Sequence, residues 1–138
     1  TRTDSSAASD VYKRQVAQDV SGNRVPAQQD LSYNIAITKT FLTGSGSVDI
    51  RLSRKYRGES YADIWNNDRA EIPESHNGDL LVSYRPNDGD WYVNGFVKNL
   101  DDSRDLIYLR AGSNFQGGNL YGSITEPRTF GLMFGTKF

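Results

Sequence analysis

Residues 128–138 place a bulky apolar side chain at nearly every second position. Successive side chains of a β-strand point to opposite faces, so residues two apart share a face. One face of this segment then carries Phe130, Leu132, Phe134 and Phe138, interrupted only by Thr136. The opposite face carries glycines, threonine, methionine and lysine. The pattern predicts a strand with one side suited to lipid or a protein core and another side that tolerates water.

Four earlier segments alternate with the same period, at residues 31–41, 47–56, 79–85 and 91–97. Each has aliphatic or aromatic residues on one face and mainly polar residues on the other, which is typical of half-exposed strands. Two charges, Lys39 and Arg54, fall on the otherwise apolar side. The chain is therefore expected to be all-β, with about five strands.

The connections between these segments alternate in length. Residues 43–46 and 86–90 are tight turns, whereas 58–77 and 101–127 are long. An antiparallel up-and-down meander sorts its connections in this way, with the tight turns at one end and the long loops at the other. Within the second long connection, residues 105–111 and 119–124 are extended in character, and Gly117-Gly118 favours a hairpin turn between them.

Composition bounds the possible classes of protein. The mean hydropathy is −0.64, but a barrel strand needs apolar residues only at alternate positions, so this low value does not exclude a bilayer. No apolar run approaches the roughly 20 residues of a spanning helix. Sixteen basic and seventeen acidic residues are interspersed, which gives no nucleic-acid footprint. Without cysteine, the redox compartment is undetermined.

Several short motifs occur in a distinctive order. Leu81-Val82-Ser83-Tyr84-Arg85 precedes a polar turn and Trp91, and Val97-Lys98-Asn99-Leu100-Asp101 follows. Pro127-Arg128-Thr129-Phe130-Gly131 then leads to Lys137-Phe138. The segment from about residue 28 to 138 resembles the C-terminal barrel strands of TonB-dependent outer-membrane receptors. It departs from the family pattern at Thr136, where an aromatic residue is common.

The resemblance implies a 22-stranded transmembrane β-barrel, of which residues 16–138 would form the C-terminal strands. Such a receptor takes up a scarce ligand, namely an iron siderophore, a cobalamin or an oligosaccharide, with energy supplied through TonB. Its partners would be TonB, contacted through a missing N-terminal part, the barrel assembly machinery, outer-membrane lipid and the small-molecule ligand. The expected location is the outer membrane of a Gram-negative bacterium, without a cofactor and without enzymatic activity.

Residues 1–15 are excluded from the fold prediction. They lack the features of a secretory signal, and residues 5–15 resemble a translated sequencing adaptor, so we expect a non-native or disordered leader. A native polar loop is the alternative.

Two sets of residues are candidates for function. Aromatic and polar residues in the long connections can bind sugars or aromatic siderophores, although they can equally pack the loops together. The ligand-binding candidates are Tyr61, Trp65, Tyr108, Arg110, Asn114, Phe115 and Tyr121. The candidates for membrane contact and for the assembly signal are Trp91, Phe130, Leu132, Phe134 and Phe138.

Other chemistry has little support in the sequence. The single histidine, His76, is expected to be a solvated loop residue rather than a metal ligand, and no nucleophile with a neighbouring base is recognisable. Two alternatives remain open, namely another outer-membrane barrel such as a porin and a soluble carbohydrate-binding β-sandwich. In a sandwich, Phe130, Leu132 and Phe134 would be buried against a second sheet.

Overall fold

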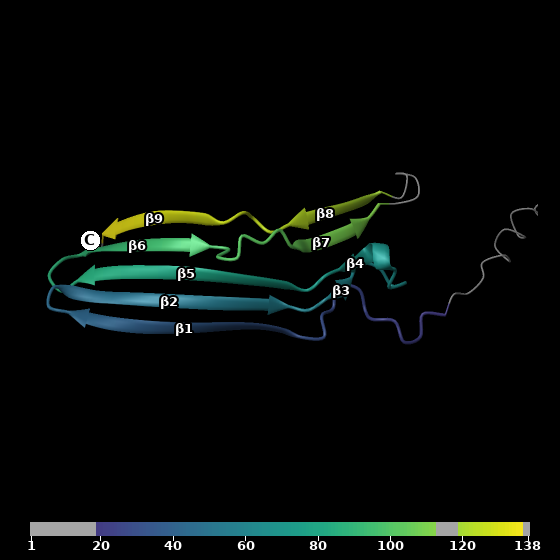
Figure 1. Ribbon diagram of the computed structural model, residues 1–138, viewed down its shortest axis with the longest axis horizontal. Helices are drawn as coiled ribbons and strands as arrows, with labels where there is room; N and C mark the ends of the chain where they lie inside the picture. Colours follow the sequence, from purple (N-terminus) through teal and green to yellow (C-terminus); the bar gives the residue numbers. More distant parts are fainter. Residues whose placement is uncertain (1–18, 113–118, 137–138) are drawn as a thin grey trace, which may run out of the picture.

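The computed structural model describes residues 19–112 and 119–136, and within them the protein is all-β, with one short 3-10 turn. Its main feature is a five-stranded antiparallel sheet with strands in the order β1-β2-β5-β6-β9 (Figure 1). The strands are β1 (Ser32–Thr43), β2 (Gly46–Arg57), β5 (Ser75–Pro86), β6 (Trp91–Lys98) and β9 (Thr129–Thr136). This order confirms the predicted antiparallel meander.

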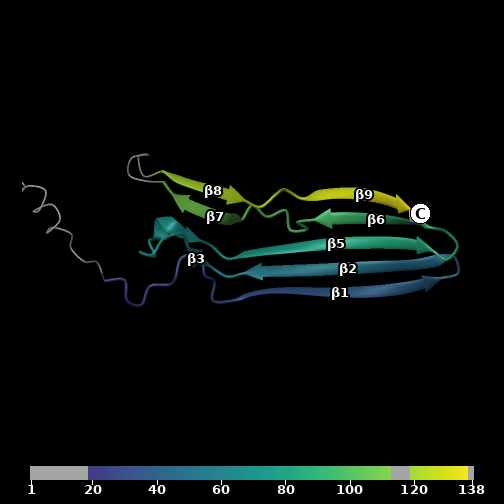
Figure 2. The same ribbon diagram turned by 180° about the vertical axis from the view of Figure 1, so that it is seen from behind.

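Two smaller sheets lie beyond one end of the main sheet (Figures 1 and 2). One pairs β3 (Ser60–Tyr61) with β4 (Glu71–Ile72), next to the 3-10 turn η1 (Asp68–Ala70). The other is the hairpin of β7 (Leu106–Ala111) and β8 (Leu120–Ile124). The hairpin confirms the predicted extended segments, whereas its expected turn at Gly117-Gly118 lies outside the described residues. We call this end of the sheet the loop end and the opposite one the turn end.

The connection predicted as a loop over residues 58–77 is more ordered than the sequence suggests. β5 begins at Ser75 and is twelve residues long, so His76 lies in a strand and its assignment to a loop was wrong. Polar residues such as Ser75, His76 and Asn77 have weak strand preference. They are held in the strand because β2 extends to Arg57 and pairs with each of them.

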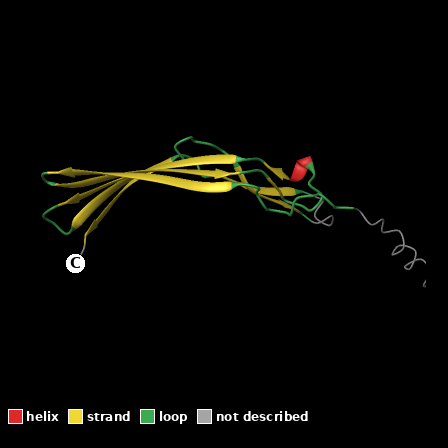
Figure 3. Ribbon diagram, turned by 90° about the horizontal axis from the view of Figure 1, so that it is seen from below, coloured by secondary structure: helices red, strands yellow, loops and turns green. Residues whose placement is uncertain are grey.

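The sheet is a single twisted layer (Figure 3). Among the described residues, the only buried apolar side chains are Ala70 in η1 and Ile72 in β4, both at the loop end. Apart from the loop end, no described element covers either face of the main sheet (Figures 1 and 2). The sheet therefore has no core of its own, and its stability within this chain comes from strand pairing and from contacts between neighbouring side chains.

The two tight turns lie side by side and are hydrogen-bonded to each other. The N–H of Asn87 donates to the carbonyl of Ser45 at 3.0 Å, and its side-chain amide donates to the carbonyl of Gly44 at 3.2 Å. Gly46 allows the close approach of β5, because a Cβ at this position would lie 2.3 Å from the carbonyl oxygen of Arg85. The turn chemistry thus fixes the register of the first three long strands.

Candidate functional site

One face of the main sheet is a continuous apolar surface. The strand register aligns its side chains in rows, such as Phe41-Val48-Tyr84-Val93-Phe134 and Ile37-Leu52-Leu80-Val97-Phe130. We name the aliphatic and phenyl side chains between the ends of this face the apolar band. It comprises Ile35, Ile37, Ile50, Leu52, Leu80, Val82, Val97, Phe130 and Leu132.

The candidate membrane-facing residues of β9 are among the most exposed side chains of this apolar face. Phe130 is 80% exposed, Leu132 83% and Phe134 69%. Exposed contiguous apolar surface on this scale marks contact with lipid or with another protein surface. No second sheet packs on these residues within the described part of the chain, as the sandwich alternative would require. Phe138, the fifth candidate of this set, lies outside the described residues.

Aromatic rings border the apolar band at both ends. At the loop end, the rings of Tyr33 and Tyr56 stack at 5.2 Å, and His76 lies 5.0 Å from Tyr56. At the turn end, Trp91 lies 5.7 Å from Tyr84 and 6.0 Å from Phe134. We name these the loop-end aromatic row (Tyr33, Tyr56 and His76) and the turn-end aromatic cluster (Tyr84, Trp91 and Phe134).

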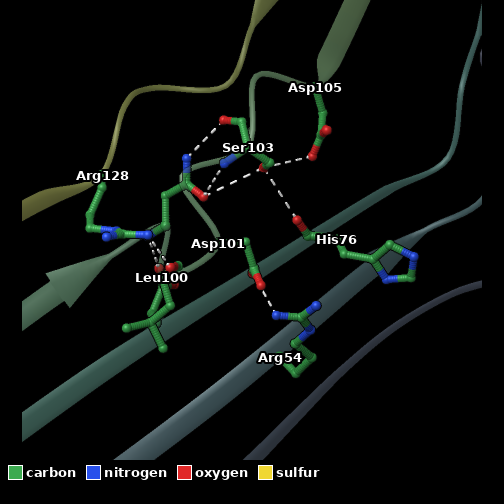
Figure 4. A network of polar contacts seen from close by, with 9 residues as sticks. Arg54, His76, Leu100, Asp101, Ser103, Asp105 and Arg128 are labelled. Carbon is green, nitrogen blue, oxygen red and sulfur yellow. Dashed lines mark hydrogen bonds and ion pairs between the residues drawn. The ribbon is translucent and has the colours of Figure 1, made fainter.

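Lys39 and Arg54, the two charged residues that the sequence pattern places on the apolar side, lie on the apolar face of the sheet. Lys39 pairs with Ile50 inside the band, with its ammonium group 5.9 Å from the centre of the Phe41 ring. Arg54 lies nearer the loop end, between the band and the loop-end aromatic row, where its guanidinium donates to the carboxylate of Asp101 (Figure 4). Asp101 belongs to the connection after β6, so the ion pair crosses β5.

A glycine in β5 makes this ion pair sterically possible. A Cβ added at Gly78 would lie 3.1 Å from Nη1 of Arg54 and 3.5 Å from Oδ2 of Asp101. The neighbouring guanidinium lowers the pKa of Asp101 below its usual value, chiefly through the hydrogen bond. The described partner of Arg54 is thus an internal carboxylate, and its side chain remains 48% exposed.

Asn99 is the centre of a hydrogen-bonded cluster at the loop end, and it is only 3% exposed. Its side-chain amide donates to the carbonyls of Ser103 at 3.0 Å and Glu126 at 2.8 Å, and its Oδ1 accepts the Ser103 N–H at 3.1 Å. Its backbone adopts φ +52°, a left-handed conformation that asparagine tolerates better than most residues. Asn99 thus closes the base of the β7–β8 hairpin, because it binds the chain just before β7 and just after β8.

Arg128 and Asp102 extend this cluster to the start of β9. The Arg128 guanidinium donates to the carbonyl of Leu100 at 2.7 Å (Figure 4). Its backbone N–H donates to the Asp102 carboxylate at 2.9 Å, and this bond lowers the pKa of Asp102. The connection after β6 is also joined to β5 by the Leu100 N–H, which donates to the carbonyl of Gly78 at 2.8 Å.

The opposite face of the main sheet is largely polar. Asp49 accepts hydrogen bonds from Thr40 at 2.6 Å and from Arg85 at 2.7 Å. Toward β9 this face also carries two aromatic rings that lie over glycines. A Cβ added at Gly131 would meet the Phe96 ring at 2.7 Å, and one at Gly135 would meet the Tyr92 ring at 2.3 Å.

The loop end of this polar face forms a cleft beneath the hairpin. Lys55, Arg57 and Lys98 line it from the sheet, and Ile107 and Ile124 line it from the hairpin. Arg57 fixes the hairpin by donating from Nη1 to the carbonyl of Ile107 at 2.7 Å and from Nη2 to that of Leu106. The sequence analysis did not single out Arg57, since nothing local distinguishes it from other arginines on a polar face.

The ligand-binding candidates fall into two groups at the loop end. Tyr61 lies in β3 and pairs with Glu71, and Trp65 lies 46% exposed in the connection between β3 and η1. Tyr108, Arg110 and Tyr121 belong to the hairpin, where Arg110 pairs with Tyr121. β7 also contacts β4 and η1. Asn114 and Phe115 lie outside the described residues.

The connection that carries Trp65 is bound to the segment before β1. Asn23 donates to the carbonyl of Ile64 at 2.9 Å, and Asn66 exchanges hydrogen bonds with the backbone of Arg24 at 2.6 and 3.1 Å. The residues joined by these contacts are separated by 41 or 42 positions in the sequence. Sequence reasoning missed them because amide-to-backbone pairing over such a distance leaves no periodic signal.

Among residues 19–112 and 119–136, no three histidine, cysteine or carboxylate side chains are grouped as a metal site would need. In the same part of the chain, no helix has the length and apolar character required to cross a bilayer. Comparisons with family models, with curated proteins and with solved structures returned no match.

Proposed function

We propose that this chain forms C-terminal strands of the β-barrel of a TonB-dependent outer-membrane receptor that takes up a scarce ligand. The observation that carries the proposal is the uncovered apolar band bounded by the loop-end aromatic row and the turn-end aromatic cluster. Transmembrane barrels present an apolar belt about 25 Å tall between two aromatic girdles. A soluble sheet gains nothing from that arrangement.

The dimensions of the band support a bilayer. His76 and Tyr84 mark its two ends on β5, eight positions apart. At about 3.4 Å per residue they are roughly 27 Å apart along the strand. A strand tilt of about 40° reduces this to about 20 Å along the membrane normal, close to the height of a barrel's apolar belt.

The sheet edges and the connections also agree with a barrel. Within the described residues β1 and β9 are edge strands, and a long unprotected edge favours aggregation unless it is paired. In a 22-stranded barrel each would pair with a strand outside this chain. Short turns at one end and long connections at the other match the periplasmic and extracellular ends of such barrels.

The polar face would then line the barrel interior, and the loop end would face outward with the ligand-binding candidates. Uptake would be a binding and conformational process without covalent chemistry on the ligand. TonB would act through an N-terminal part of the complete protein, and the barrel assembly machinery would insert the strands.

The decisive experiment is to express the complete coding sequence in a Gram-negative host with and without a functional TonB. The proposal expects the protein in the outer-membrane fraction and ligand accumulation only when TonB is present. Accumulation that is unchanged without TonB would instead establish a passive porin. Recovery of the protein as a soluble periplasmic monomer would contradict any membrane assignment.

A further inference from the structure

An exposed indole lies in a shallow polar hollow at the loop end of the chain. The hollow is lined by Asp19, Asn23, Trp65 and Asn67, and its surface is mainly polar apart from the indole. An exposed indole offers a large, rigid ring face beside a polar N–H, which suits the binding of a ligand that has both apolar and polar groups.

The hollow is rigid because its two segments are hydrogen-bonded to each other and within themselves. The backbone N–H of Trp65 donates to Oδ1 of Asp63 at 3.1 Å, and the side-chain amide of Asn67 donates to Oδ2 of the same carboxylate at 3.2 Å. Asn66 adopts φ +50° and bonds Arg24 in both directions. The backbone that carries the indole is therefore held in place before any ligand arrives, which lowers the entropic cost of binding.

The polar groups around the indole mainly offer acceptors. The amide of Asn23 already donates to Ile64 and that of Asn67 to Asp63, and no described donor binds the amide oxygen of either residue. Asp19 adds a carboxylate, whose Oδ1 accepts the Ser21 N–H at 2.8 Å. Hydroxyl groups are donors that suit such acceptors, and sugar hydroxyls can also accept from the remaining amide hydrogens.

The negative charge of Asp19 favours a neutral ligand over an anionic one in this hollow. Hydrogen bonds from the side chain and backbone of Ser21 lower the pKa of Asp19, so the carboxylate stays ionised at neutral pH. A carboxylate disfavours an anionic ligand in the same hollow. The weakly positive C–H face of a pyranose, in contrast, is attracted to the negative face of an indole.

We propose that this hollow binds one pyranose unit of a neutral oligosaccharide, which stacks on Trp65 and donates hydroxyls to Asp19, Asn23 and Asn67. The inference rests on the proposed function and narrows it, because it selects the oligosaccharide among the three ligand classes considered. The site would be an outer subsite, at the end of the sheet farthest from the tight turns.

The chain contains two tryptophans, which provide a reporter and a matched control. In a Trp91→Phe variant of the full chain, refolded in detergent micelles, all indole emission comes from Trp65. Maltotriose, cellotriose and xylotriose are titrated to about 10 mM. We expect a saturable change in emission with at least one of them and a dissociation constant of about 1 mM, typical of a single weakly held sugar unit.

Titration calorimetry, which needs no tryptophan reporter, separates a binding role of Trp65 from a structural one. Trp65→Ala should weaken binding of the responding trisaccharide at least tenfold, Trp65→Tyr should retain part of it, and Trp91→Ala should leave it unchanged. Asp19→Asn and Asn67→Ala should each weaken it several-fold. Asn87→Ala, which alters an asparagine at the turn end, is the matched control.

Several results would overturn the inference. These are the absence of any response to the three trisaccharides, equal loss of binding in Trp65→Ala and Trp91→Ala, or a response of Trp65 to calcium chloride or citrate but not to sugar. The outcome is separable from that of the proposed function. A chain that inserts into lipid but binds no trisaccharide overturns this inference alone, and a chain that binds the sugar but never inserts overturns the membrane proposal.

Discussion

Replacing Asn99 with alanine should destabilise the chain much more than the matched substitution Asn87→Ala in the tight turn. The change removes the donors to the carbonyls of Ser103 and Glu126 and the acceptor for the Ser103 N–H. Asn99 is nearly fully buried, and a buried polar group left without its partner costs about 1–3 kcal/mol. Alanine at φ +52° adds about 1 kcal/mol of backbone strain. We expect a total loss of about 2–4 kcal/mol.

Urea unfolding of the chain in detergent micelles, followed by circular dichroism, measures this loss. Asn99→Gly removes the same side chain without the backbone strain, so it should cost about 1 kcal/mol less than Asn99→Ala. Asn87→Ala is the control, since it removes one exposed hydrogen bond of 3.2 Å to Gly44. Hydrogen exchange should show that amides of β7 and β8 lose protection first, because Asn99 closes the base of their hairpin.

Two outcomes would refute this reasoning. If Asn99→Ala costs no more than Asn87→Ala, the buried hydrogen bonds do not hold the hairpin. If Asn99→Gly is as unstable as Asn99→Ala, the left-handed backbone contributes nothing.

Three further predictions concern other parts of the sheet. Gly131→Ala should displace the Phe96 ring, because the new Cβ would lie 2.7 Å from it. Nuclear magnetic resonance should show altered chemical shifts of the Phe96 ring. The control variant Gly22→Ala should leave those shifts unchanged. The pKa of Asp101 is lowered in the folded chain. Its contribution to stability should therefore be complete above its unfolded pKa of about 4 and be lost as the pH falls through the lower folded value. Asp101→Asn should abolish that part of the pH dependence of urea unfolding. Lys39→Leu should stabilise the lipid-inserted chain by up to about 2 kcal/mol, because a lysine inside the apolar band is costly in lipid, whereas the same variant should gain nothing if that face meets water.

The five long strands could be predicted because alternation is a local signal. Phe130, Leu132 and Phe134 share a face whatever the rest of the chain does, and the register bears this out by aligning them with Val97, Gly95 and Val93. The hairpin segments were predictable for the same reason. The structure adds that the apolar side chains of separate strands fall into common rows, which no single segment reveals.

The parts that could not be predicted depend on contacts between distant residues. His76 reads as a loop residue in the sequence, and it becomes part of a strand because Tyr56 pairs with it. The Arg54 ion pair with Asp101 requires Gly78 between them, a coincidence of three separate segments. For Trp65, the sequence indicated a ligand-binding candidate, whereas its rigid presentation depends on side-chain amides from another segment.

The central claim is that the apolar band faces hydrocarbon, and neighbouring residues of β9 test it. Leu132 and Met133 lie on opposite faces, with exposures of 83% and 52%. In a chain lacking both native tryptophans, Leu132→Trp and Met133→Trp are each reconstituted into vesicles of lipids brominated on their acyl chains. The account predicts strong quenching of the tryptophan at position 132 and little at position 133. Equal quenching at the two positions, or stronger quenching at 133, would contradict it.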